Sequence, residues 1–266
     1  MFHGRLLLEL AKKAFQRQMA YRAANIAGLL TNLFFGMLRA SVMVAVFAYR
    51  DNVGGYTLSR AITFTGLTQA LLAPIQLWGW RYVMDTIKSG AIVSDLARPI
   101  DFYLYWLAQD MGRALYHLFF RGVPILLLYW IFFPIDFPVG LAQWGLFGLS
   151  LALALLLAFS LNFAVNLAAF WVVDAIGIIR ITGLVHMFLS GFLVPAAFFP
   201  PWLRLLARLT PFISIVNTPV EVYLGVITGR QALQGVLEQF LWLLLLMALG
   251  RGLLQQGVKK LTIQGG

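Results

Sequence analysis

The stretch Arg81–Pro99, RYVMDTIKSGAIVSDLARP, joins two long apolar segments of the chain. It gathers charged side chains in a chain that has few of them elsewhere, at positions Arg81, Asp85, Lys88, Asp95 and Arg98. Such a charged, partly helical connector is either the solvated end of a helical hairpin or a surface on which another protein docks. We expect this connector to be both, with the apolar segments on either side of it crossing a lipid bilayer.

The composition of the whole chain is that of a membrane protein. Hydrophobic residues make up 61% and charged residues 11% of the 266 residues, whereas soluble domains carry about 25% charged residues. The net charge of +10 fits contact with anionic lipid headgroups and a positive-inside topology better than binding of nucleic acid. The absence of cysteine excludes disulfides and cysteine-based metal sites. The predicted fold class is an all-α integral membrane protein.

Apolar runs long enough to cross a bilayer predict six transmembrane helices. They cover residues 24–48, 61–80, 112–133, 141–171, 176–199 and 232–249. Residues 1–22 form a basic amphipathic stretch, which is typical of a helix lying on the membrane surface, and no signal-peptide cleavage site follows it. We therefore treat residues 1–266 as one transmembrane domain.

The distribution of basic residues predicts the orientation of these helices. Six spans place both ends of the chain on the same side, and the segments on that side hold most of the lysines and arginines outside the spans. Positive charge accumulates on the cytoplasmic side of membrane proteins. We therefore expect both termini and the connector Arg81–Pro99 in the cytoplasm.

Several kinds of chemistry are excluded by missing motifs. The chain contains no GxxxxGK[ST] phosphate loop, no HExxH metal motif and no GxSxG nucleophile elbow, and its three histidines are scattered. An enzyme is therefore disfavoured, and no metal site is predicted. Few acidic residues lie inside the predicted spans, which leaves a proton- or sodium-coupled carrier poorly equipped.

Two ionisable residues deep in the predicted spans are candidates for the translocation path. Arg39 in the first span and Glu238 in the sixth lie at a similar depth, within roughly 3 Å along the helix axes. They form a buried ion pair if the two helices are neighbours. Otherwise both side chains reach towards headgroups or water.

The third predicted span carries basic residues at helical spacing. Arg113, His117 and Arg121 recur every four residues and share one face. This stripe faces a cavity or an anionic lipid, or else it lies near the headgroups. We expect the headgroup position for Arg113 and leave Arg121 open as an intramembrane candidate. His186 in the fifth span is predicted to be a packing residue, although it remains among the polar candidates for the pathway.

The predicted fifth span is interrupted before its outer end. A glycine and several prolines, with a short amphipathic piece after them, favour a re-entrant segment over a simple kink, because the freed backbone groups need partners from neighbouring helices. The residues that define this segment are Gly191, Pro195, Pro200, Pro201, Trp202 and Pro211.

These motifs, in their order along the chain, resemble those of a known family, the membrane permeases of ABC-2 type transporters. They resemble in particular bacterial permeases of about this size. The resemblance covers the whole chain. It rests on Phe15-Gln16-Arg17, Tyr21-Arg22, Gln69, Lys88-Ser89-Gly90, Asp95-Leu96-Ala97-Arg98-Pro99, Phe170-Trp171, Ser190-Gly191 through Pro195, Phe199-Pro200-Pro201-Trp202-Leu203 and Pro211-Phe212.

The resemblance implies that the connector is the coupling helix, which sits in a cleft of a cytoplasmic ABC ATPase. The residues implied in this coupling are Asp85, Lys88, Gly90, Asp95, Leu96, Arg98 and Pro99. Two ATPase copies and a second permease, identical or homologous, are the implied partners, with ATP and magnesium bound by the ATPase and no cofactor in this chain. The re-entrant segment is implied to cap the pathway, and the implied location is the bacterial plasma membrane.

The leading function is thus the permease subunit of an ATP-driven exporter that moves a hydrophobic or amphipathic substrate, such as a drug-like compound, a lipid or a glycolipid. A non-transporting membrane scaffold is the first alternative and predicts no ATPase partner. A secondary carrier is the second, and it predicts inverted repeats, for which the two halves of the sequence give no sign.

Overall fold

The computed structural model describes residues 2–76, 80–172 and 174–261, and those ranges contain helices and no β-strand. The α-helices are α1 (Phe2–Met19), α2 (Arg22–Phe47), α3 (Leu58–Ile75), α4 (Tyr82–Lys88), α5 (Ile92–Leu96), α6 (Phe102–His117), α7 (Val123–Phe132), α8 (Leu141–Asn166), α9 (Ile176–Leu189), α10 (Pro201–Arg208), α11 (Phe212–Leu224) and α12 (Gly229–Val258). A π-helical turn, η1 (Leu118–Gly122), joins α6 to α7, and the 3₁₀ turns are η2 (Leu167–Phe170) and η3 (Ala196–Phe198). The predicted all-α class is confirmed.

Within the described residues, four continuous helices are long and apolar enough to cross a membrane. They cover Arg22–Phe47, Phe102–Phe132, Leu141–Phe170 and Gly229–Val258. The shortest has 26 residues, which corresponds to roughly 39 Å at 1.5 Å per residue and exceeds the hydrocarbon thickness of about 30 Å. The chain is therefore a multi-pass membrane protein.

The second predicted span, 61–80, is a shorter helix than expected. It appears as α3 with 18 residues, or roughly 27 Å, and residues 77–79 lie outside the described part. Nearly all of α3 is buried, including the polar residues Thr63, Thr65, Thr68 and Gln69. Thr65 donates to the carbonyl of Ala61 one turn earlier at 2.9 Å, which satisfies its hydroxyl inside the protein. The helix packs against protein on all sides and needs less apolar surface than a lipid-facing span.

The fifth predicted span, 176–199, is also shorter. Helix α9 has 14 residues and ends at Leu189, which gives it a length of roughly 21 Å. Gly191 follows with φ +79, a left-handed conformation that ends a helix at little cost for glycine. The predicted interruption thus ends the helix instead of bending it.

Two further boundaries differ from the prediction. The third span begins at Phe102 instead of residue 112, because Asp101 caps the helix by accepting the amide of Leu104 at 2.9 Å. The sixth, α12, extends beyond 232–249 at both ends.

Helix α11 was not predicted, since its polar residues obscure its apolar character, yet it is buried along most of its length against α3, α8 and α12.

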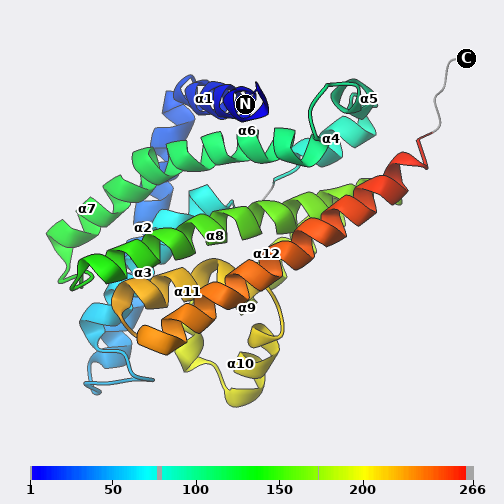
Figure 1. Ribbon diagram of the computed structural model, residues 1–266. Coiled ribbons are helices and arrows are strands. Elements are labelled where there is room, and N and C mark those ends of the chain that lie inside the picture. Colours follow the sequence, from blue (N-terminus) through cyan, green and yellow to red (C-terminus); the bar gives the residue numbers. More distant parts are fainter. Residues whose placement is uncertain (1, 77–79, 173, 262–266) are drawn as a thin grey trace, which may run out of the picture.

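Figure 1 shows how these helices are arranged. Helices α8 and α12 run side by side, and α1 lies across α6. The short helices α4 and α5 lie at the same end of the molecule as α1 and the C-terminal end of α12, whereas α10 lies at the opposite end. The main core is built between α3, α8 and α11. This arrangement separates a connector end from an α10 end.

Candidate functional site

The connector consists of α4 and α5, joined at a glycine. Gly90 has φ +75 and open space where a side chain would project, so its backbone conformation and not crowding requires glycine here. Asp85, Lys88 and Val93 are exposed, and Lys88 pairs with Asp174 at 3.2 Å at the surface. These side chains form the accessible face of the connector.

Other predicted coupling residues support the connector from within. Asp95 is buried and pairs with Arg98 at 2.9 Å, and the Arg98 guanidinium lies 4.4 Å from the centre of the Tyr105 ring. Burial raises the pKa of Asp95, although Arg98 acts in the opposite direction. Leu96 packs into a hydrophobic cluster around Phe102 and Trp80, while Pro99 is exposed.

The start of the connector is fixed by Asn166 at the end of α8. Its side-chain amide donates to the carbonyl of Trp80 at 2.8 Å and accepts the amide of Met84 at 3.0 Å. One side chain holds both the entry to α4 and its first turn.

A buried ion pair continues this attachment to α6 and α3. Asp110 accepts from the Trp80 indole at 2.9 Å and pairs with Arg113 at 2.7 Å. Arg113 also donates to the carbonyls of Ala73 and Pro74 at 2.8 and 2.9 Å, which lie in the last turn of α3, where carbonyls find no partner within the helix itself. These acceptors hold Arg113 inside the protein, where its side chain is buried, and its position relative to the headgroups stays a prediction. Asp110 was not predicted, although its i, i+3 spacing to Arg113 is a usable signal.

Arg39 does not pair with Glu238. Its guanidinium donates to the carbonyl of Phe192, to the carbonyl of Leu193 at 3.0 Å and to the Thr68 hydroxyl at 3.2 Å. Helix α2, which carries Arg39, packs on α3 and α7, whereas α12 packs on α8 and α11. The condition for the ion pair, neighbouring helices, is therefore not met.

The other intramembrane candidates have different surroundings. Arg121 lies in the π-helical turn, and its guanidinium packs against Gly28 of α2. The approach is so close that a Cβ atom at Gly28 would lie 2.6 Å from the guanidinium. A hollow of about 300 Å³ adjoins Arg121, His117 and Gln76. His186 is buried, with its ring 5.4 Å from that of Phe212.

The segment after α9 is held by α11. The Asn217 side chain accepts the amide of Ala196 at 3.0 Å, and its backbone amide donates to the carbonyl of Ser190 at 3.1 Å. Together with the bonds from Arg39, these contacts satisfy backbone groups that the break at Gly191 releases. The prolines of this segment stand at the starts of helices, where the missing amide costs no hydrogen bond. Pro195 and Pro200 directly precede η3 and α10, and Pro201 is the first residue of α10. Pro211 directly precedes α11. Trp202 is exposed on α10.

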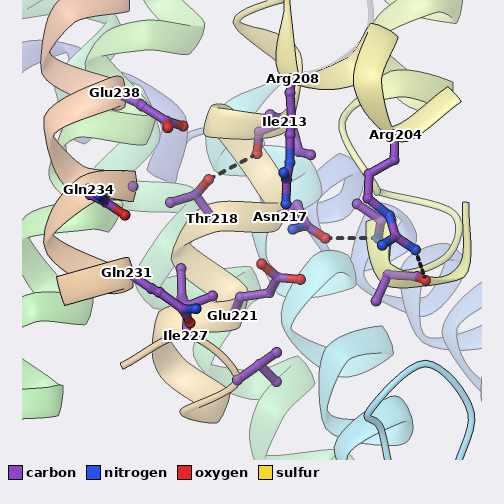
Figure 2. A pocket seen from close by; sticks show the side chains of 14 residues that line it. Arg204, Arg208, Ile213, Asn217, Thr218, Glu221, Ile227, Gln231, Gln234 and Glu238 are labelled. Atoms are coloured by element: carbon purple, nitrogen blue, oxygen red, sulfur yellow. Dashed lines mark hydrogen bonds between the residues drawn. The ribbon is translucent and has the colours of Figure 1, made fainter. Parts of the chain in front are cut away.

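Figure 2 shows a polar cavity of about 430 Å³ between α10, α11 and α12. Arg204 and Arg208 reach into it from α10, Glu221 from α11 and Glu238 from α12. The Tyr56 hydroxyl donates to Glu221 at 3.3 Å, and burial, together with this carboxylate, raises the pKa of Tyr56. Of these cavity residues, the sequence singled out only Glu238.

A second hollow is apolar. Its volume is about 520 Å³, and it lies between α3, η1, α7 and α8. Aliphatic and aromatic side chains line it, among them Leu67, Phe119, Trp130 and Phe147.

A membrane-embedded helical chain with a charged connector at one end and a broken helix at the other matches a known family model. The model of the ABC-2 family transporter protein covers residues 33–265. This chain belongs to the ABC-2 transporter family. Comparison with curated proteins finds no match. ABC-2 permeases are transport subunits of the membrane, are not themselves catalytic and generally work with an ABC ATPase.

Proposed function

We propose that this ABC-2 family member is the permease subunit of an ATP-driven exporter and that α4–α5 docks a cytoplasmic ABC ATPase. The observation that carries the proposal is the attachment of the connector. Asn166, Asp110 and Arg113 bind the entry of α4 to α8, α6 and α3 through direct hydrogen bonds. A force applied to the connector is thereby passed to three membrane helices instead of being absorbed by a loop.

The proposed assembly contains two ATPase subunits and a second permease, identical or homologous. ATP and magnesium bind the ATPase, whose closure moves the two connectors together and shifts the permeases between inward- and outward-facing states. The proposed topology has six crossings, with α3 and α9 as the short ones, both termini in the cytoplasm of a bacterial plasma membrane, and residues 1–266 as one transmembrane domain. Helix α1 lies on the inner surface, and α10–α11 form the re-entrant outer segment.

The proposed cargo is hydrophobic or amphipathic. The apolar hollow between α3, α7 and α8 supports this class, because aliphatic and aromatic walls suit a lipid, a glycolipid or a drug-like compound. Aromatic rings such as those of Trp130 and Phe147 accept many apolar shapes, so the hollow favours a class of cargo and not one compound.

Affinity purification of the tagged protein in mild detergent tests the docking proposal. We expect an ABC ATPase to co-purify with the wild type and to be lost from the double variant Asp85→Lys, Val93→Asp, which changes only exposed connector positions. The control Arg230→Glu changes an exposed charge at the start of α12 and should retain the ATPase. Recovery of intact permease without an ATPase would instead favour a membrane scaffold.

A further inference from the structure

The polar cavity contains opposite charges that are held apart. Arg204 and Arg208 of α10, Glu221 of α11 and Glu238 of α12 all line it. Salt bridges within the described residues join other side chains, and none of them includes these four. Opposite charges that share a partly desolvated space gain by pairing unless the geometry prevents it. Here Arg204 and Glu221 are bound instead to other partners, namely the carbonyls of Ala197 and Phe199 and the Tyr56 hydroxyl.

The charged groups are positioned before any ligand arrives. The Arg204 guanidinium donates to the carbonyls of Ala197 and Phe199 at 2.5 and 3.2 Å, which fixes the long side chain against the segment that precedes α10. Glu221 is fixed by the Tyr56 hydroxyl, and in Figure 2 Arg208 extends from α10 towards Asn217. Fixed groups of this kind lose little conformational entropy on binding.

The surroundings of α10 indicate where this cavity lies. The side of α10 away from the cavity exposes large apolar residues, namely Trp202, Leu205, Leu206 and Leu209. A short helix with one charged and one apolar face is typical of the membrane interface, where tryptophan is enriched. We therefore expect the cavity at the level of lipid headgroups.

We infer that this cavity binds the headgroup of a zwitterionic phospholipid that carries a primary ammonium group. The arginines take the phosphate, whose oxygens match the donor fork of a guanidinium, and Glu221 and Glu238 take the ammonium. Gln231 and Gln234 of α12 add amide groups to the wall of the cavity. The inference goes beyond the proposed function, because headgroup binding needs neither an ATPase nor transport.

Calorimetric titration of the delipidated full-length protein in non-ionic detergent tests this inference. The probes are dihexanoyl phosphatidylethanolamine, dihexanoyl phosphatidylglycerol and soluble glycerophosphoethanolamine. We expect saturable binding of the first probe and binding of the phosphatidylglycerol, which lacks an ammonium, about tenfold weaker, equivalent to about 1.4 kcal/mol. Glu238→Gln should weaken binding of the phosphatidylethanolamine about tenfold and leave the phosphatidylglycerol unaffected.

Two further variants separate the arginine contribution from general effects. Arg208→Gln should weaken binding of both lipids, because both carry the phosphate, whereas Arg230→Gln, outside the cavity, should change neither. Size-exclusion profiles show whether each variant is folded. If Arg208→Gln does not fold, Glu238→Gln still tests the inference. The inference is overturned if folded wild type shows no saturable binding, or if both lipids bind equally and Glu238→Gln has no effect. Equal affinity for glycerophosphoethanolamine would overturn the lipid as the source of the headgroup.

Discussion

Asp110 and Arg113 face each other at 2.7 Å with side chains only 6% and 5% exposed. Removing one partner leaves a buried charge uncompensated, so Asp110→Asn should lower the free energy of unfolding by about 3–5 kcal/mol. The exposed pair of Arg251 and Asp101, at 3.7 Å, is the control, because Arg251→Gln should cost only about 0–1 kcal/mol. Unfolding in mixed micelles with increasing SDS measures both. Equal shifts for the two variants would contradict the structural role of Asp110.

Two carboxylates near the connector should respond to pH in opposite directions. Burial raises the pKa of Asp95, so its contribution to stability is full below the ordinary pKa of 3.8 and is lost as pH rises through the folded value. The amide of Ile176, with Lys88, lowers the pKa of Asp174, so its contribution is present above 3.8 and is lost as pH falls through the folded value.

The stability of Asp95→Asn relative to wild type should therefore increase as pH rises from below 4, and that of Asp174→Asn should decrease over the same range. The melting temperatures of the three proteins between pH 3 and pH 7 measure this. Parallel pH profiles for the two variants would show that the two environments do not differ as described.

For single residues, the sequence shows which side chains are out of place in an apolar helix, but it does not show which groups they bind. Arg39 stood out because a charge inside an apolar run is costly. Its acceptors, the carbonyls of Phe192 and Leu193, lie far away in the sequence and become available only because α9 stops. Asp110 went unnoticed, since at the start of a span it looks like an ordinary headgroup-level charge.

Among the elements, the break after α9 depends most clearly on one residue. Gly191 has φ +79, and a side-chain carbon there would lie 2.9 Å from the Asn217 carboxamide oxygen. Gly191→Ala should therefore destabilise the protein by at least about 1–2 kcal/mol from the left-handed conformation alone. Thermal unfolding in detergent measures the effect.

Gly177 provides the matched control for that variant. It lies in α9 with open space around it, so Gly177→Ala should be neutral or stabilise by up to about 1 kcal/mol through helix propensity. A Gly191→Ala protein as stable as Gly177→Ala would mean that the break does not require glycine.

Long apolar helices were predictable from the sequence, whereas α11, a buried helix with polar residues, was not. Helix α8, a continuous apolar run, appears close to its predicted limits. Helix α11 has Ser214, Asn217 and Thr218 in its interior, and these are buried because Gln239 of α12 donates to the carbonyl of Ser214 and Asn217 holds the segment after α9. Hydropathy alone cannot reveal such partners.

For the whole molecule, the two ends differ in chemistry. The connector end combines exposed charges with hydrogen bonds to α3, α6 and α8, and the α10 end combines an apolar outer face with a charged cavity. Docking of an ATPase at the first end and contact with lipid headgroups at the second agree with this difference. The connector is the part on which the proposed function depends.

Site-specific crosslinking from the connector tests that proposal most directly. The chain has no cysteine, so Val93→Cys, an exposed position on α5, introduces a single reactive thiol. Val139→Cys is the matched control, because Val139 is 98% exposed in the loop between α7 and α8. In membranes that contain the ATPase, a thiol-to-amine crosslinker should join Val93→Cys, and not Val139→Cys, to that ATPase. A crosslink from Val139→Cys, or none from Val93→Cys while the ATPase still co-purifies, would contradict docking at the connector.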